Sequence, residues 1–273
     1  MAAPTQDRRM RRPEPPRRAP RKMYPWPLNL YQTAVGKKWV MALTGLGLIG
    51  FVLAHMAGNL KLYMGAEDIF DYGEFLKEMG SPLIPKTHLL WILRAGLLTM
   101  FVLHIHSAYS LTRLNAASNP KANPTGQKRY EGGQEFAAAN FASRSMRWTG
   151  VIIALYVIFH LLDLTWGATS DGWVKTDHYN NIVDSFQRVP VAIIYIVANV
   201  ALAIHIFHGA WSMFQSLGLT SPMWNHIRRY VAYGVSAAIL IGNVSFPVAV
   251  LLGIVDHVEP TYLEEASALL ALI

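Results

Sequence analysis

The sequence predicts an all-α membrane protein, a bundle of five transmembrane helices. Hydrophobic residues make up 52% of the 273 residues and charged residues only 15%, whereas about 25% charged residues is usual for soluble domains. The hydrophobic residues gather in five runs, each close to the ~20 residues that a helix needs to cross ~30 Å of hydrocarbon. Only helices or closed barrels satisfy their backbone in lipid, and the runs lack the alternation of barrel strands.

The runs divide the chain into three parts. The predicted spans, at about 39–58, 89–111, 148–166, 189–213 and 230–255, lie within a transmembrane domain at 28–258. Residues 1–27 form a basic arm rich in Arg and Pro, which we expect to be disordered or bound to a partner because it cannot bury apolar surface. Residues 259–273 are a tail, in which the stretch from Pro260 to Ile273 is amphipathic enough for a short surface helix.

The 24 Lys and Arg residues are unevenly shared between the two sides of the predicted bundle. Eighteen precede the first span or lie in the 113–147 and 214–229 loops, five lie in the other loops, and Arg94 falls inside a span. The positive-inside rule therefore predicts a cytoplasmic N-terminus and a C-terminus outside. The net charge of +7 is thus explained by topology, and we expect no nucleic-acid partner.

Histidine carries the chemistry of this sequence. The chain has no Cys, which excludes disulfides, thiolate catalysis and any iron–sulfur or zinc site built wholly from its own sulfurs. Ionisable side chains inside membrane spans are costly and default to functional roles. Four of the five spans contain histidines: His55; His104 and His106; His160; His205 and His208.

Helical geometry predicts how these histidines pair. At 1.5 Å per residue, His55 and His160 lie farther from the inner helix ends than His106 and His205, and the mean depths differ by about 8 Å. We therefore pair His55 with His160 and His106 with His205. His104 lies about 200° around the helix from His106, so the two cannot face the same centre. Two facing imidazoles can hold a haem from both sides, which suits electron transfer because no iron position stays open.

Several segments resemble the cytochrome b membrane anchor of succinate dehydrogenase/fumarate reductase, of the single-chain, five-helix type. Gly36-Lys37-Lys38, with Met41 and Thr44-Gly45, is similar to that family's start of the first helix. The other matching segments are Leu53-Ala-His55-Met-Ala-Gly-Asn59-Leu60, Leu103-His-Ile-His106-Ser-Ala-Tyr109, Ile158-Phe-His160-Leu and His205-Ile-Phe-His208-Gly-Ala-Trp-Ser-Met-Phe-Gln-Ser-Leu-Gly218.

The resemblance implies the membrane subunit of complex II in a bacterial cell membrane. Such a subunit docks a flavoprotein and an iron–sulfur subunit on its cytoplasmic face, contacts membrane lipid and exchanges electrons with quinone. We expect succinate oxidation in the tricarboxylic acid cycle and menaquinone as acceptor, with succinate bound elsewhere than on this chain. A higher-order oligomer of the complex is left open.

The resemblance also implies which residues bind metal. One or two b haems are expected, with His106 and His205 as ligands of the inner haem and His55 and His160 as ligands of the outer one. His208 is expected as a hydrogen-bond donor close to these ligands.

The quinone site has two candidate positions. A quinone needs an apolar slot and hydrogen-bond donors to its carbonyl groups. Near the inner surface the candidates are Gln32, Lys38, Trp39, Arg113, Trp211 and Ser212; near the outer surface they are His88, Arg94, Asp163 and Trp166.

Three alternatives remain open at the level of sequence. A His-ligated Rieske-type [2Fe–2S] cluster would have to take its thiolates from a partner subunit or use other ligands. The chain could instead be the dihaem b subunit of a hydrogenase, formate dehydrogenase or nitrate reductase. A transporter could use the histidines for proton relay, although neither an internal repeat nor a broken helix is evident in the sequence.

Overall fold

The computed structural model describes residues 24–259 except 27, 118–140 and 220. Five helices in this part of the chain are long and apolar enough to cross a membrane, which confirms the predicted fold class. Each helix extends past the predicted apolar run at its start or end, because backbone hydrogen bonding continues beyond the apolar residues. The five are α2 (Ala34–Asn59), α4 (His88–Ala117), α5 (Phe141–His160), α7 (Val189–Ser216) and α8 (Pro222–Leu251).

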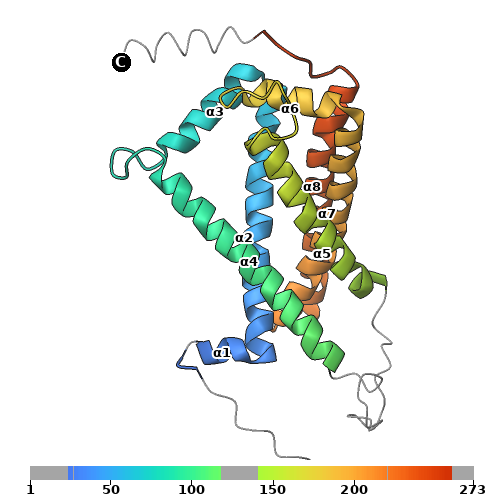
Figure 1. The fold of residues 1–273 in the computed structure, drawn as a ribbon. Coiled ribbons are helices and arrows are strands. Elements are labelled where there is room, and N and C mark those ends of the chain that lie inside the picture. Colours follow the sequence, from blue (N-terminus) through green and yellow to red (C-terminus); the bar gives the residue numbers. More distant parts are fainter. Residues whose placement is uncertain (1–23, 27, 118–140, 220, 260–273) are drawn as a thin grey trace, which may run out of the picture.

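The spans form a loose bundle around α2 and α7. Helix α2 packs against α4 and α7, and α7 also packs against α5 and α8. Helix α4 crosses α2 obliquely and diverges from the other helices toward one end (Figure 1). Its side chains Trp91, Leu98 and Val102 are more than half exposed, as suits a helix surrounded by lipid tails that are as apolar as Leu.

Shorter helices mark the two ends of the bundle. Helix α1 (Leu28–Gln32) lies at one end, whereas α3 (Ala66–Glu78) and α6 (His178–Gln187) lie at the other (Figure 1). We call the end with α3 and α6 the capped end. We call the opposite end the basic end, because the starts of α2 and α8 and the last turns of α4 place cations there: Lys37, Lys38, Arg113, Arg228 and Arg229.

The capped end contains a cluster of buried apolar side chains. Helices α3 and α6, which the sequence analysis did not predict, are amphipathic and bury Ile69 and Val183 against this cluster. Asp177 caps α6 by accepting a hydrogen bond from the backbone N of Asn180 at 3.0 Å. Asn180 in turn bonds both backbone groups of Val258, so the segment after α8 is tied to the cap.

Helix α5 does not end as a regular α-helix. Its last turn, η3 (Leu161–Thr165), is π-helical, a form that is rare and frequent at functional sites. Gly167 follows with a φ of +63°, a left-handed conformation that favours glycine, and Trp173 packs where a side chain would lie. The indole of Trp173 donates to the carbonyl of Leu164 at 3.1 Å. This turn places Asp163 inside the protein, where it is 1% exposed.

Some predictions fall beyond the described residues. These include nearly all of the basic arm at 1–27 and the tail helix between Pro260 and Ile273. The cytoplasmic position of the N-terminus remains a prediction.

Candidate functional site

At two places in the bundle, two histidines from different helices face each other. His55 on α2 and His160 on α5 have ring centroids 6.0 Å apart, with ring planes inclined by 80°. The two helices come from distant parts of the sequence, so the pair exists only in the folded bundle. The structure thus brings together the pair that we predicted for the outer site.

The second pair is formed by His104 on α4 and His205 on α7. Their ring centroids lie 6.4 Å apart and their planes are inclined by 63°. We had expected His106 in this position. The imidazole of His106 instead lies 2.5 Å from the Tyr31 hydroxyl and stacks on the Tyr31 ring with centroids 5.7 Å apart. The 200° between His104 and His106 allows one of them to face α7, and that one is His104.

Thr44 fixes the tautomer of His104. The Thr44 hydroxyl donates to the carbonyl of Val40 at 2.6 Å, so its oxygen accepts from Nδ1 of His104 at 3.3 Å. The carbonyl of Met41 accepts from the same Nδ1 at 3.1 Å. Because a carbonyl can only accept, Nδ1 carries the proton and the lone pair of Nε2 is left for a metal.

Thr149 does the same for His205. Its hydroxyl donates to the carbonyl of Ser145 at 2.9 Å and therefore accepts from Nδ1 of His205 at 3.1 Å. His205 is also hydrogen-bonded to the backbone of Met146. Metal-binding histidines almost always donate their other ring N–H in this way, which fixes the ring and raises its basicity.

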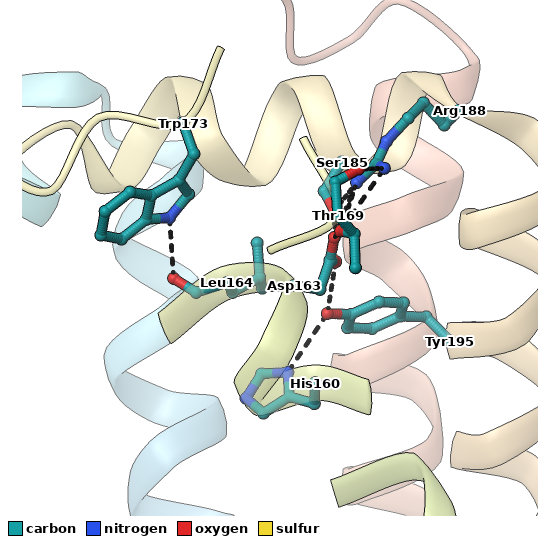
Figure 2. A network of polar contacts seen from close by, with 8 residues as sticks. All are labelled: His160, Asp163, Leu164, Thr169, Trp173, Ser185, Arg188 and Tyr195. Atoms are coloured by element: carbon teal, nitrogen blue, oxygen red, sulfur yellow. Dashed lines mark hydrogen bonds and ion pairs between the residues drawn. The ribbon is translucent and has the colours of Figure 1, made fainter. Parts of the chain in front are cut away.

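Tyr195 provides the corresponding contact for His160. The Tyr195 hydroxyl donates to Asp163 at 2.8 Å, so its oxygen accepts from Nδ1 of His160 at 3.3 Å. Figure 2 shows this chain of contacts, with His160 below the Tyr195 hydroxyl and Asp163 above it. Three of the four facing histidines therefore hold their Nδ1 proton toward the protein and have Nε2 available as a ligand.

The distance between the rings fits one metal ion between each pair. A metal–imidazole bond is about 2.0–2.1 Å long, so two rings on opposite sides of one ion have centroids about 6 Å apart. The observed 6.0 and 6.4 Å agree with this spacing. The residues thus fit bis-histidine ligation at two positions.

The two pairs lie at different levels of the bundle. Thr44, which contacts His104, is 11 residues from His55 on α2, and Thr149 is 11 residues from His160 on α5. Eleven residues of helix span about 16 Å, twice the difference in depth expected from the sequence. One ion cannot contact both pairs, so the arrangement provides two separate sites.

An internal repeat, which we did not see in the sequence, underlies this arrangement. Residues 41–55 and 146–160 align without gaps at an offset of 105 and share five identities: Met41 and Met146, Thr44 and Thr149, Gly45 and Gly150, Val52 and Val157, His55 and His160. In each helix the Thr-Gly pair meets a His of the following long helix. The pair of His55 and His160 is therefore formed by equivalent residues of the repeat, and the pair of His104 and His205 by the two histidines that contact its Thr residues.

The glycines of the repeat bring these histidines close to the neighbouring helix. A Cβ atom at Gly45 would lie 3.2 Å from Cε1 of His104, and one at Gly150 would lie 3.5 Å from Cε1 of His205. Absence of a side chain at Gly45 thus lets the His104 ring lie directly against α2. The spacing Thr-Gly followed by His ten residues later was the sequence signal that could have identified both sites.

The other predicted residues lie outside these pairs. His208 makes its ring contact with Phe207, with centroids 5.0 Å apart. The inner quinone candidates share the basic end but are held by local contacts there. Arg113 donates to the Tyr109 hydroxyl at 3.1 Å, Ser212 donates to its own helix backbone, and Trp211 lies against Arg228 and Arg229. Gln32 ends α1, and Lys38 and Trp39 lie in the first turns of α2.

The outer quinone candidates are also separated. His88 lines a surface pocket of about 570 Å³ at the start of α4 together with Trp91, and Arg94 lies over the Trp91 ring at 5.0 Å. Asp163 is buried in the network of Figure 2, whereas Trp166 is 63% exposed. The structure therefore favours neither quinone position over the other.

Comparison with known proteins finds a family model that matches part of the chain. The family model of the succinate dehydrogenase/fumarate reductase transmembrane subunit matches residues 121–244. The match includes α5, α7 and most of α8, and hence His160 and His205. No curated protein and no solved structure matches the chain. The family match agrees with the resemblance seen in the histidine motifs of α5 and α7.

Proposed function

Because the family model of the succinate dehydrogenase/fumarate reductase transmembrane subunit matches residues 121–244, we propose that the chain is a subunit of this kind and conducts electrons between an iron–sulfur subunit and membrane quinone. The chain is the membrane subunit of an oxidoreductase complex. The observation that carries the proposal is the presence of two facing histidine pairs at two levels of one bundle.

Two b haems would occupy these positions. His55 and His160 would hold the haem nearer the capped end, and His104 and His205 the one nearer the basic end. Bis-histidine ligation leaves iron no open position, so the group supplies one-electron transfer rather than oxygen chemistry. The proposal replaces His106 by His104, because only His104 faces His205.

The chain's own residues prepare both sites for this role. The hydroxyl groups of Thr44, Thr149 and Tyr195 accept hydrogen bonds from the Nδ1–H groups of the facing histidines. These bonds prevent the imidazole rings from turning their Nε2 atoms away from the site. Fixed ligands need little rearrangement when the charge of a bound ion changes, which favours fast electron transfer.

The proposed partners bind at the basic end of the bundle. The basic end would dock the flavoprotein and iron–sulfur subunits, because its Lys and Arg side chains fit the cytoplasmic side by the positive-inside rule. We propose menaquinone as electron acceptor and a bacterial cell membrane as location. We propose the quinone site at the basic end because it would lie close to the docked, electron-donating iron–sulfur subunit there; its residues are those predicted from the sequence: Gln32, Lys38, Trp39, Arg113, Trp211 and Ser212.

An activity assay on the purified complex tests this role. We expect the His205→Ala complex to lose succinate-driven menaquinone reduction while it still oxidises succinate with an artificial acceptor that takes electrons from the soluble subunits. The His226→Ala complex is the matched control, because His226 lies near the start of α8 away from both pairs. Unchanged menaquinone reduction in the His205→Ala complex would contradict the proposal.

A further inference from the structure

A buried carboxylate lies next to the capped-end pair. Asp163 is 1% exposed, and its Oδ1 accepts from Arg188 at 2.6 Å and from the Thr169 hydroxyl. Its Oδ2 accepts from Tyr195 at 2.8 Å and from the Ser185 hydroxyl. A buried charge is tolerated only when it is paired and hydrogen-bonded, and these four donors meet that requirement.

The network of Figure 2 extends from this carboxylate to His160. A phenol hydroxyl has a single proton, and Tyr195 uses it to donate a hydrogen bond to Asp163. The phenol oxygen is therefore an acceptor for Nδ1–H of His160. The chain of donors runs in one direction, from the imidazole through the phenol to the carboxylate, and the pull of the anion on the Tyr195 proton makes its oxygen a stronger acceptor.

Arg188 holds the carboxylate in this position. Its guanidinium also donates to the backbone carbonyl of Thr169 at 2.6 Å and to Ser185 at 2.9 Å. The arginine thus connects the segment after α5 with the last turn of α6. The π-helical turn η3 brings Asp163 to this meeting point.

The repeat lacks this feature in its first half. The position equivalent to Asp163 in α2 is Gly58, against which the ring of Tyr72 packs. The His104 and His205 rings donate to neutral threonine hydroxyls. His160 is thus linked to an anion, while its equivalents in the bundle are linked to neutral groups or stacked on Phe51, as His55 is.

We propose that Asp163, acting through Tyr195, is a positioning residue that strengthens His160 as a ligand and lowers the reduction potential of the capped-end centre relative to the other. A ring whose N–H is drawn toward an anion donates more electron density to a metal. Greater donation stabilises the oxidised ion, and hydrogen bonding around the ligands is one of the means by which proteins set haem potentials. The inference rests on the proposed haem sites.

Redox titration of the whole complex, followed by the visible bands of its haems, tests the inference. In the Tyr195→Phe complex the midpoint potential of one haem rises and that of the other stays as in the wild type. The Asp163→Asn complex shifts the same haem in the same direction, because the anion is lost. Tyr156→Phe is the matched control: its ring, which packs against Tyr195 at 5.2 Å and His160 at 5.8 Å, is kept, no hydrogen bond from His160 to Asp163 is lost, and neither potential moves.

The outcomes distinguish failure of this inference from failure of the proposed function. Two bound haems with wild-type potentials in the Tyr195→Phe complex would overturn this inference and leave the proposed function intact. A wild-type complex without haem would overturn the proposed function and the inference with it. If the Asp163→Asn complex does not assemble, the Tyr195→Phe complex decides alone, since its ring still fills the space between Phe186 and His160.

Discussion

Exchange of His104 for Ala tests the assignment on which sequence and structure differ. The His104 ring is 6.4 Å from that of His205, and Ala leaves no nitrogen at the ligand position. The nearest other histidine of α4, His106, points about 200° away, so it cannot substitute. We expect the His104→Ala complex to contain one haem per chain instead of two, a loss of half the haem.

His106→Ala is the matched control in the same turn of the same helix. His106 is exposed and contacts Tyr31, whose hydroxyl is also hydrogen-bonded to Ser107. We expect this complex to keep two haems per chain. The haem content of both complexes is measured by extraction and by the reduced-minus-oxidised spectrum, relative to protein.

Electron transfer should follow the haem content. Mutation of a residue that only hydrogen-bonds a metal ligand typically lowers metal affinity or activity about 10–100-fold. Loss of the ligand itself should therefore lower quinone reduction by at least that factor. Loss of a haem from the His106→Ala complex, together with two haems in the His104→Ala complex, would refute the geometric reasoning.

Three further predictions concern the support of the sites and of the capped end. Thr149→Val removes the hydroxyl that holds His205 and should weaken haem binding about 10–100-fold in a haem titration, whereas Thr112→Val, which breaks only a contact within α4, should not. Asp177→Ala removes the cap of α6 and should cost about 1 kcal/mol, seen as a lower melting temperature; an unchanged melting temperature would contradict the capping role. Burial, together with the nearby charge of Lys77, lowers the pKa of His178 below 6.5. The unfolded state therefore binds more protons, and stability should fall as the pH drops through about 6.5. The melting temperature of the His178→Gln complex should depend less on pH than that of the wild type, and an equal dependence would contradict this cause.

The five spans could be predicted because a membrane demands long apolar runs. Runs such as 189–213 stand out in composition alone, and the structure confirms all five. Helices α3 and α6 could not be found in this way. They are amphipathic and short, and their stability depends on burial of side chains such as Ile69 and Val183 against the ends of the spans.

The candidate site could be predicted only in part. That His55 and His160 share a level follows from counting residues along a helix, and the structure brings them together. The choice between His104 and His106 depends on which face of α4 meets α7, and residue depth contains no information about that rotation. The folded structure supplies it, because there Thr44 contacts His104 as Thr149 contacts His205.

The network around Asp163 could not be predicted from spacing. Asp163 lies one turn after His160 in the sequence, where we predicted it only as one of the outer quinone candidates. Its partners come from later segments and meet it through the π-helical turn: Thr169, Ser185, Arg188 and Tyr195. Tertiary contacts of this kind depend on the path of the backbone after the helix, for which local sequence gives little signal.

The reduced-minus-oxidised spectrum of the purified wild-type complex tests the central claim most directly. Two facing histidine pairs predict the bands of low-spin b haem, with two haems for each copy of this chain. A complex that contains iron without haem, with the electron paramagnetic resonance signal of an iron–sulfur cluster assigned to this subunit, would contradict the account. A complex whose membrane subunit contains no iron would contradict it as well.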